Sequence, residues 1–217
     1  MSEALERHLE REIEGEVRFD RVSRALYSTD ASVYHIEPLG IVVPKSRADV
    51  VATVNAARRY DTSITARGGG TSQAGQAVGA GVQLDTSKYF NRILELNIAE
   101  RWVRVEPGIV LDQLNSTLRP HGLRFAPDIS TASRATIGGM VANNSSGARS
   151  IVYGKTIDHV RALDVVLADG SLAHFGPLDS MTAARLGRGS TREALAYRAV
   201  QEQAELDRLH AQLSDEA

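Results

Sequence analysis

The 217-residue sequence contains no cysteine. Disulfides, thiolate catalysis and thiolate-held zinc or iron–sulfur centres are therefore excluded within these residues. The sequence also lacks a run of about 18 consecutive apolar residues, the length that a membrane-spanning helix needs. The first 16 residues are charged throughout and contain no apolar signal core. From these absences we expect a chain without a transmembrane segment and a cytoplasmic location.

Excess charge of either sign is also missing. The 25 Lys and Arg residues nearly balance the 27 Asp and Glu residues, and the net charge is -2. No sequence-wide field would draw such a chain to nucleic acid or to an anionic membrane. We therefore expect a small-molecule ligand, and the length allows one sizeable core or two small subdomains that share a cleft.

The first half of the chain predicts a parallel βαβ unit that ends in a glycine-rich loop. An apolar run at 41–43 precedes Ser46, which can cap a helix with one apolar face. Asp49 is expected to be a solvated acid in the first turn of that helix. A second short strand at 64–66 runs directly into the loop at 67–75. Ligands of α/β sheets bind at this carboxyl edge.

The remaining pattern mixes strands and helices. It predicts strands at 82–85, 93–96 and 102–105, helices at 2–14, 111–118 and 191–213, and a hairpin at 160–175 around Asp169-Gly170. We expect an α+β fold in four parts: an N-terminal helical segment (1–36), a first subdomain that contains the βαβ unit (37–98), a second subdomain (99–178) and a helical tail (179–217).

The glycine loop matches neither common phosphate motif. Gln76 occupies the position of the P-loop lysine, and Gln73 occupies the third glycine position of the Rossmann motif. What remains is a run of backbone N–H groups at 68–72, flanked by the hydroxyls of Thr71 and Ser72, which can form an anion-binding nest. This pattern favours diphosphate binding without lysine or magnesium, although three glycines alone could form only a flexible turn.

A second loop, at Thr136–Gly139, offers another hydroxyl and two glycines that open a helix. The first N–H groups of that helix and the positive end of its dipole can face the same ligand. Two such loops, about 65 residues apart, suggest one long ligand clamped between two subdomains.

A series of spaced residues carries a family resemblance. In order along the chain these are Pro44, Asp49-Val50, Gly68-Gly69-Gly70-Thr71-Ser72, Pro107-Gly108, Pro127-Asp128, Ala135-Thr136-Ile137-Gly138-Gly139, Asn144, Gly147, Tyr153-Gly154 and Asp169-Gly170. The chain resembles, over about 37–176, the FAD-binding domain of the vanillyl-alcohol oxidase and p-cresol methylhydroxylase (PCMH-type) superfamily. The segments 70–78, 84–88 and 139–148 look like the FAD-linked oxidases of the D-lactate, glycolate and D-2-hydroxyglutarate dehydrogenase group, which are fused to iron–sulfur modules.

The resemblance implies a PCMH-type fold of two α/β subdomains with an extended FAD clamped between them, incomplete at the C-terminus. The flavin diphosphate would lie on the two glycine loops, with other residues along the path to the flavin ring and Val160 offering backbone hydrogen bonds to the adenine. The implied cofactor residues are Gly68, Gly69, Gly70, Thr71, Ser72, Gly75, Pro127, Asp128, Thr136, Gly138, Gly139, Asn143, Ser146 and Val160. Asp128 and Asn143 could instead only satisfy local backbone groups, and Val160 could be a core strand residue.

Two departures from the family pattern matter. Thr71 stands where covalently flavinylated members commonly carry histidine, so FAD is expected to be bound non-covalently. The family's substrate-binding cap, with its histidines and arginine, is not expected within these residues, so no catalytic residue is assigned and the chain is either a piece of a longer protein or a short relative. The histidines form no metal-ligand pattern. Arg67, Arg134 and Arg149 adjoin the loops and are expected to pair with phosphate or to be solvated.

The expected activity is hydride transfer from a 2-hydroxy acid to FAD in the full-length enzyme. Two alternatives stay open. The chain could be the separate FAD subunit of a multi-subunit dehydrogenase, with the cap and iron–sulfur parts on other chains. It could also be a non-catalytic module that has lost its flavin and serves as a scaffold.

Overall fold

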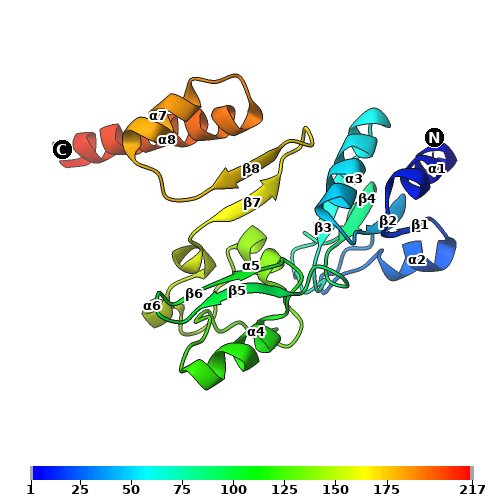
Figure 1. The fold of residues 1–217 in the computed structure, drawn as a ribbon, viewed down its shortest axis with the longest axis horizontal. Coiled ribbons are helices and arrows are strands. Elements are labelled where there is room, and N and C mark those ends of the chain that lie inside the picture. The colour runs from blue at the N-terminus through cyan, green and yellow to red at the C-terminus, as the bar shows by residue number, and fades with distance from the viewer. Residues whose placement is uncertain (1, 216–217) are drawn as a thin grey trace. The chain divides into compact units, whose positions relative to one another are not determined.

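The computed structural model describes residues 2–215, with side chains described except for residues 206 and 208–215. The chain forms two compact units, Met1–Val160 and Arg161–Ala217 (Figure 1). Each unit is described by itself.

A four-stranded sheet organises the first part of the first unit. Its strands are β1 (Glu16–Arg18), β2 (Gly40–Val43), β3 (Ile64–Arg67) and β4 (Val82–Asp85), in the order β1-β2-β4-β3. β2, β4 and β3 run parallel, while β1 pairs antiparallel with β2. The predicted βαβ unit is confirmed, with β4 inserted between its two strands. Because β3 and β4 are parallel and in register, the glycine loop leaves the sheet at its carboxyl edge.

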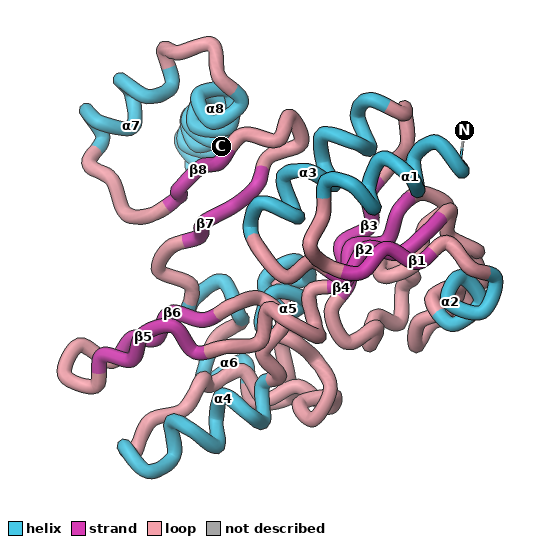
Figure 2. The backbone as a smooth tube through the Cα atoms, turned by 45° about the vertical axis from the view of Figure 1, so that its right-hand side comes forward, coloured by secondary structure: helices cyan, strands magenta, loops and turns pink. Residues whose placement is uncertain are grey.

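Three helices accompany this sheet: α1 (Ser2–Glu12), α2 (Arg21–Leu26) and α3 (Arg47–Arg59). α1 and α3 lie side by side (Figure 2). The core beneath them holds Leu5, Leu9, Ile13, Val42, Ala56, Val82 and Leu84. The helical spacing of Leu5 and Leu9 therefore marks a buried face that ties the N-terminal helix to the sheet.

Asp49 differs from its expectation. Only 2% of the residue is exposed, and its carboxylate accepts hydrogen bonds from the N–H groups of Lys45 at 2.8 Å and Glu14 at 3.2 Å. Burial opposes the charge and is the largest single influence on the pKa of Asp49, but these hydrogen bonds and those of Ser46 together hold that pKa below its ordinary value. The side chain is therefore a buried link between the segment that follows α1 and the start of α3, where Ser46 caps the helix as predicted.

The second part of the first unit has its own core. Its elements are β5 (Ile93–Asn97), β6 (Trp102–Val105), α4 (Leu111–Leu118), α5 (Ile137–Asn143), α6 (Ser150–Tyr153) and two 3₁₀ turns at Arg119–His121 and Thr156–His159. The buried residues are Ile109, Leu111, Leu114, Leu118, Ala135, Ile137 and Met140. Ile93 and Leu96 of β5 pack against this core, and β5 pairs with β6 of the same part. The structure thus places β5 with the second core, ahead of the predicted boundary at residue 98.

The second unit contains the hairpin β7 (Leu163–Val166) and β8 (Leu172–Phe175), followed by α7 (Ser180–Gly187) and α8 (Arg192–Asp215). The predicted hairpin is confirmed. Gly170 has a φ of +82° at its turn, and the Asp169 side chain accepts the Ser171 N–H at 3.0 Å. The Arg198 guanidinium donates to the Gly187 carbonyl at 3.1 Å, which joins α8 to α7. The finer four-part division of the chain stays a prediction.

Candidate functional site

The glycine loop after β3 presents free backbone donors. Among the described residues, the N–H groups of Gly69, Gly70, Thr71 and Ser72 donate to no protein acceptor. Gly70 has a φ of +64°, a conformation that favours glycine. The Ser72 hydroxyl accepts the N–H groups of Ala74 at 3.3 Å and Gln76 at 3.2 Å, which closes the end of the loop. Successive free N–H groups of this kind form a site for an anion.

The two predicted loops lie against each other. A Cβ at Gly68 would meet Thr136 Oγ1 at 2.1 Å, and a Cβ at Gly69 would meet the Arg134 carbonyl at 2.3 Å. Both distances are shorter than any real Cβ contact, so these positions need glycine because a second backbone passes close by. The second loop therefore packs directly against the first.

The start of α5 is already hydrogen-bonded within the protein. The N–H of Gly138 donates to the Pro107 carbonyl at 2.7 Å, and the N–H of Gly139 donates to Thr136 Oγ1 at 3.3 Å. The N–H groups that we expected to face an anion thus have protein acceptors, since this short helix packs on the Pro107 turn. A ligand contact of Thr136, Gly138 or Gly139 stays a prediction. Such a contact would have to use atoms other than the N–H groups of Gly138 and Gly139.

A chain of polar side chains links the first loop to the end of α5. Ser72 Oγ donates to Gln76 Oε1, Gln76 Nε2 donates to Asn143 Oδ1 at 3.3 Å, and Asn143 Nδ2 donates to Ser145 Oγ at 3.2 Å. Asn143 and Ser146 are exposed. Sequence reasoning missed Gln76, which served only to reject a P-loop, although its place at the end of the glycine loop is a usable signal.

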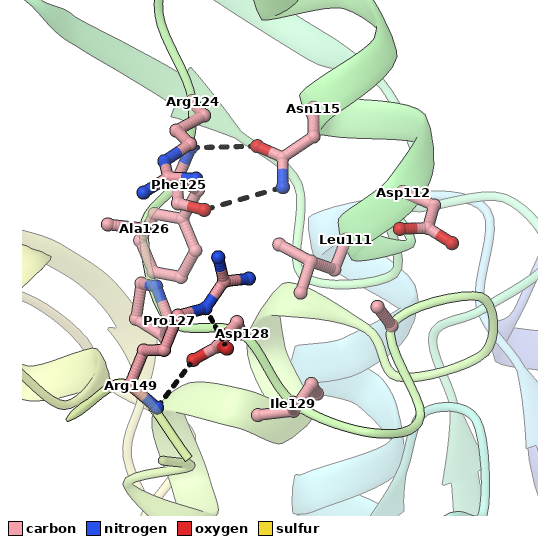
Figure 3. Close-up of a pocket in the computed structure, with 11 residues that line it drawn as sticks. Leu111, Asp112, Asn115, Arg124, Phe125, Ala126, Pro127, Asp128, Ile129 and Arg149 are labelled. Carbon is pink, nitrogen blue, oxygen red and sulfur yellow. Dashed lines mark hydrogen bonds and ion pairs between the residues drawn. The ribbon is translucent and has the colours of Figure 1, made fainter. Parts of the chain in front are cut away.

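Pro127 and Asp128 line a cavity of about 340 Å³ (Figure 3). Asp128 Oδ2 forms an ion pair with Arg149 Nε at 2.6 Å, and this hydrogen bond holds the pKa of Asp128 below its ordinary value. Across the cavity, Asn115 Oδ1 accepts the Phe125 N–H at 2.7 Å. Arg149, expected to pair with phosphate or water, has a carboxylate partner instead. Asp128 thus has a protein partner 21 residues away in the sequence, and its contact with a cofactor stays a prediction.

Gly75 and Val160 complete the predicted set. Gly75 has a φ of +77°, and a Cβ there would meet the Tyr34 ring at 2.6 Å. The N–H of Val160 donates to the Ile157 carbonyl at 3.3 Å, and β7 begins only at Leu163. Val160 therefore precedes the strand, and the adenine contact stays a prediction.

Two further features are not found among the described residues. Within the part of the chain that the structure describes, no three His, Asp or Glu side chains are grouped so that they could hold a metal ion. Between residues 2 and 215, no helix combines the length and the apolar character that crossing a bilayer requires.

The fold of the chain matches those of several solved structures. It is similar to a BBE-like protein of Physcomitrella patens (19% identity, TM-score 0.69, 79% of this chain and 37% of that chain). It is also similar to 6-hydroxy-D-nicotine oxidase of Arthrobacter nicotinovorans (23% identity, TM-score 0.67, 76% and 36%). These likenesses confirm the predicted α+β, PCMH-type fold.

The family model of the FAD binding domain matches residues 38–176. The chain belongs to the FAD binding domain family. This FAD binding domain is 44% identical over 189 residues to D-2-hydroxyglutarate dehydrogenase of Escherichia coli K12, covering 86% of this chain and 19% of that protein. It is 33% identical over 147 residues to the glycolate oxidase subunit GlcD of the same organism, covering 67% and 29%. The chain thus spans about a fifth of the length of the D-2-hydroxyglutarate dehydrogenases that it matches.

The residues of the glycine loop fit FAD. A diphosphate needs hydrogen-bond donors, and Gly69 to Ser72 present four unpartnered N–H groups. Residues 68–76 include no carboxylate that would repel it. Gly69 is exposed, so its backbone is open to close approach.

Proposed function

We propose that this chain is the FAD-binding portion of a flavin-dependent oxidoreductase that oxidises a 2-hydroxy acid. The four free N–H groups at Gly69–Ser72 carry the cofactor part of the proposal. The substrate class is supported by the relatives, which include D-2-hydroxyglutarate dehydrogenases at 42–44% identity.

In this proposal the free N–H groups bind the diphosphate, and close packing against Thr136 and the Arg134 backbone fixes the position of the loop. Gln76 and Asn143 join the first loop to α5 beside it. When bound, FAD supplies the acceptor for a hydride. Thr71 offers a hydroxyl at the position where a covalent link would require a stronger nucleophile, so the binding is non-covalent.

The groups that bind the hydroxy acid and take its proton are proposed to lie outside these residues, in a cap domain. An iron–sulfur module belongs to the same larger assembly, on the same chain or on a partner chain, and the location is cytoplasmic. A base and a carboxylate-binding cation held near the cofactor are worth several orders of magnitude in rate. This chain alone is therefore proposed to be inactive towards hydroxy acids.

Calorimetric titration of the purified chain with FAD, ADP and riboflavin tests the cofactor part. FAD and ADP should bind and riboflavin should bind weakly or not at all, since only the first two carry a diphosphate. Riboflavin binding as tight as FAD would contradict the role of the loop. No binding of any of the three would favour a scaffold that has lost its flavin.

Disruption of the coding sequence in the source organism tests the substrate class. Extracts should accumulate a 2-hydroxy acid, measured by mass spectrometry against an isogenic strain that carries the gene on a plasmid. Unchanged levels of D-2-hydroxyglutarate, D-lactate and glycolate would overturn this part.

A further inference from the structure

A segment near the N-terminus lies across the glycine loop. Residues 27–35, here called the strap, are closed by an antiparallel bridge between Thr29 and His35 and by a 3.0 Å contact between Ser28 Oγ and His35 Nε2. The Ala31 N–H donates to the Gly70 carbonyl at 3.0 Å. The strap therefore hydrogen-bonds to a carbonyl of the loop and leaves the loop's N–H groups free.

The far end of the loop is tied to the strap as well. The Ala77 N–H donates to Asp30 Oδ2 at 3.2 Å, while Asp30 Oδ1 accepts the Ser32 N–H at 2.8 Å. The Tyr34 ring lies against Gly75. The strap thus contacts the loop near its middle at Gly70, at its last residue Gly75 and just beyond it at Ala77.

Arg67 joins the two segments. Its Nη2 donates to the Thr29 carbonyl of the strap at 2.8 Å, and its Nη1 donates to the Ala77 carbonyl after the loop at 2.8 Å. The guanidinium also lies over the Tyr27 ring, 5.2 Å from the ring centroid. A Cβ at Gly70 would meet Arg67 Nη2 at 2.7 Å, so the loop folds closely around this side chain.

The strap is anchored to the sheet at its first residue. The Tyr27 hydroxyl donates to Asp85 Oδ2 at 2.5 Å, and the Tyr27 carbonyl accepts Gln83 Nε2 at 2.9 Å. Gln83 is fully buried in β4. The Arg67 guanidinium, by contrast, donates to carbonyls from two of its nitrogens. This fork uses the planar geometry of arginine, which a lysine ammonium does not reproduce.

We propose that Arg67 is a positioning residue that holds the strap and the glycine loop together through backbone carbonyls, and so presets the N–H groups of Gly69–Ser72 for a diphosphate. Arg67 acts through the loop and does not contact the phosphates. This inference rests on the proposed FAD binding only for its effect on affinity.

Arg67→Lys and Arg67→Met test the proposal, with Arg104→Lys as the matched control, because Arg104 is an exposed residue of β6. Each Arg67 variant should raise the dissociation constant of FAD at least tenfold and should raise that of ADP by the same factor. The control should leave both dissociation constants unchanged. Wild-type affinity in Arg67→Lys would overturn the proposal, because it would mean that the charge alone suffices, as in direct phosphate pairing.

Amide hydrogen exchange of the ligand-free chain gives a readout that does not depend on FAD. Exchange at Ala31 and Ala77 should accelerate at least tenfold in both Arg67 variants. Unchanged exchange at both amides would overturn the proposal even if the wild-type chain bound no FAD. A wild-type chain without FAD affinity but with accelerated exchange in the variants would instead count against the proposed function alone.

Asp30→Ala keeps the test decisive if the Arg67 variants fail to fold. It leaves Arg67 intact and removes the carboxylate that accepts the Ala77 N–H. In Asp30→Ala, FAD affinity should fall by at least threefold and amide exchange at Ala77 should be faster. Asp30→Asn should restore part of the affinity and part of the protection from exchange. Wild-type affinity and exchange in Asp30→Ala would overturn the role of the strap.

Discussion

Gly139→Ala separates damage to the protein from damage to the cofactor site. A Cβ at Gly139 would meet only Thr136 Oγ1, at 3.3 Å, and a hydroxyl can move by the few tenths of an ångström needed. Alanine is favoured over glycine inside a helix by about 0.5–1 kcal/mol. The variant should therefore be at least as stable as the wild type, with a melting temperature unchanged or raised by about 2 °C.

The same substitution should weaken FAD binding. Gly68 and Gly139 face the same hydroxyl of Thr136, so a methyl group on Gly139 lies at the edge of the loop that carries the free N–H groups. We expect at least a tenfold rise in the FAD dissociation constant, equivalent to about 1.4 kcal/mol. Fluorescence titration with FAD and a thermal melt of the same preparation give both quantities.

Gly69→Ala is the matched comparison. Its Cβ would lie 2.3 Å from the Arg134 carbonyl, whereas real Cβ contacts stay beyond 3.0 Å. Overpacking of this kind costs about 1–3 kcal/mol, so this variant should lose stability and FAD affinity together. If Gly139→Ala bound FAD as tightly as the wild type, the start of α5 would not border the cofactor, and the reasoning from the shared hydroxyl would be refuted.

Three further predictions concern the buried Asp49 carboxylate, the non-covalent binding of FAD and the activity of this chain alone. Asp49→Asn should lower the free energy of unfolding in urea by about 2–4 kcal/mol, because the amide keeps only one acceptor for the donors that surround Asp49. The difference from the wild type should shrink as the pH falls below about 4, since a carboxylate with a lowered pKa stabilises the fold above its ordinary pKa and loses that effect on protonation; a difference that did not change with pH would contradict the assignment. Acid precipitation of the FAD-loaded chain should leave the flavin in the supernatant, and flavin in the pellet would reveal a covalent link. Anaerobic mixing of the loaded chain with D-lactate, glycolate or D-2-hydroxyglutarate should leave the flavin absorbance unchanged, whereas rapid bleaching would place a working active site within these residues.

Local pattern was enough to predict the elements that position the site. The apolar run of β2, the Ser46 cap of α3 and the glycines after β3 are short-range signals, and the structure has each of them where expected. Pairing was harder, since β4 lies between β2 and β3 and no local signal tells which parallel strand enters the middle of a sheet. The three-residue edge strand β1 is too short and too polar to show a period.

The site departs from sequence reasoning where contacts are long-range. Arg67 was expected to pair with phosphate or water, but its partners are carbonyls of Thr29 and Ala77, which no spacing rule connects. Asp49 was expected to be solvated, but the packing of α1 buries it and brings the Glu14 N–H to it. In both cases a charged side chain satisfies backbone groups from distant segments, and only the folded arrangement shows which.

Backbone amide NMR of the ¹⁵N-labelled chain during titration with FAD tests the central claim most directly. Hydrogen bonds to a diphosphate should shift the amide protons of Gly69, Gly70, Thr71 and Ser72 downfield and slow their exchange, and ADP should reproduce these shifts. The amides of Gly138 and Gly139, which already have protein acceptors, should move less. Unshifted amides at 69–72 in the presence of saturating FAD would contradict the account.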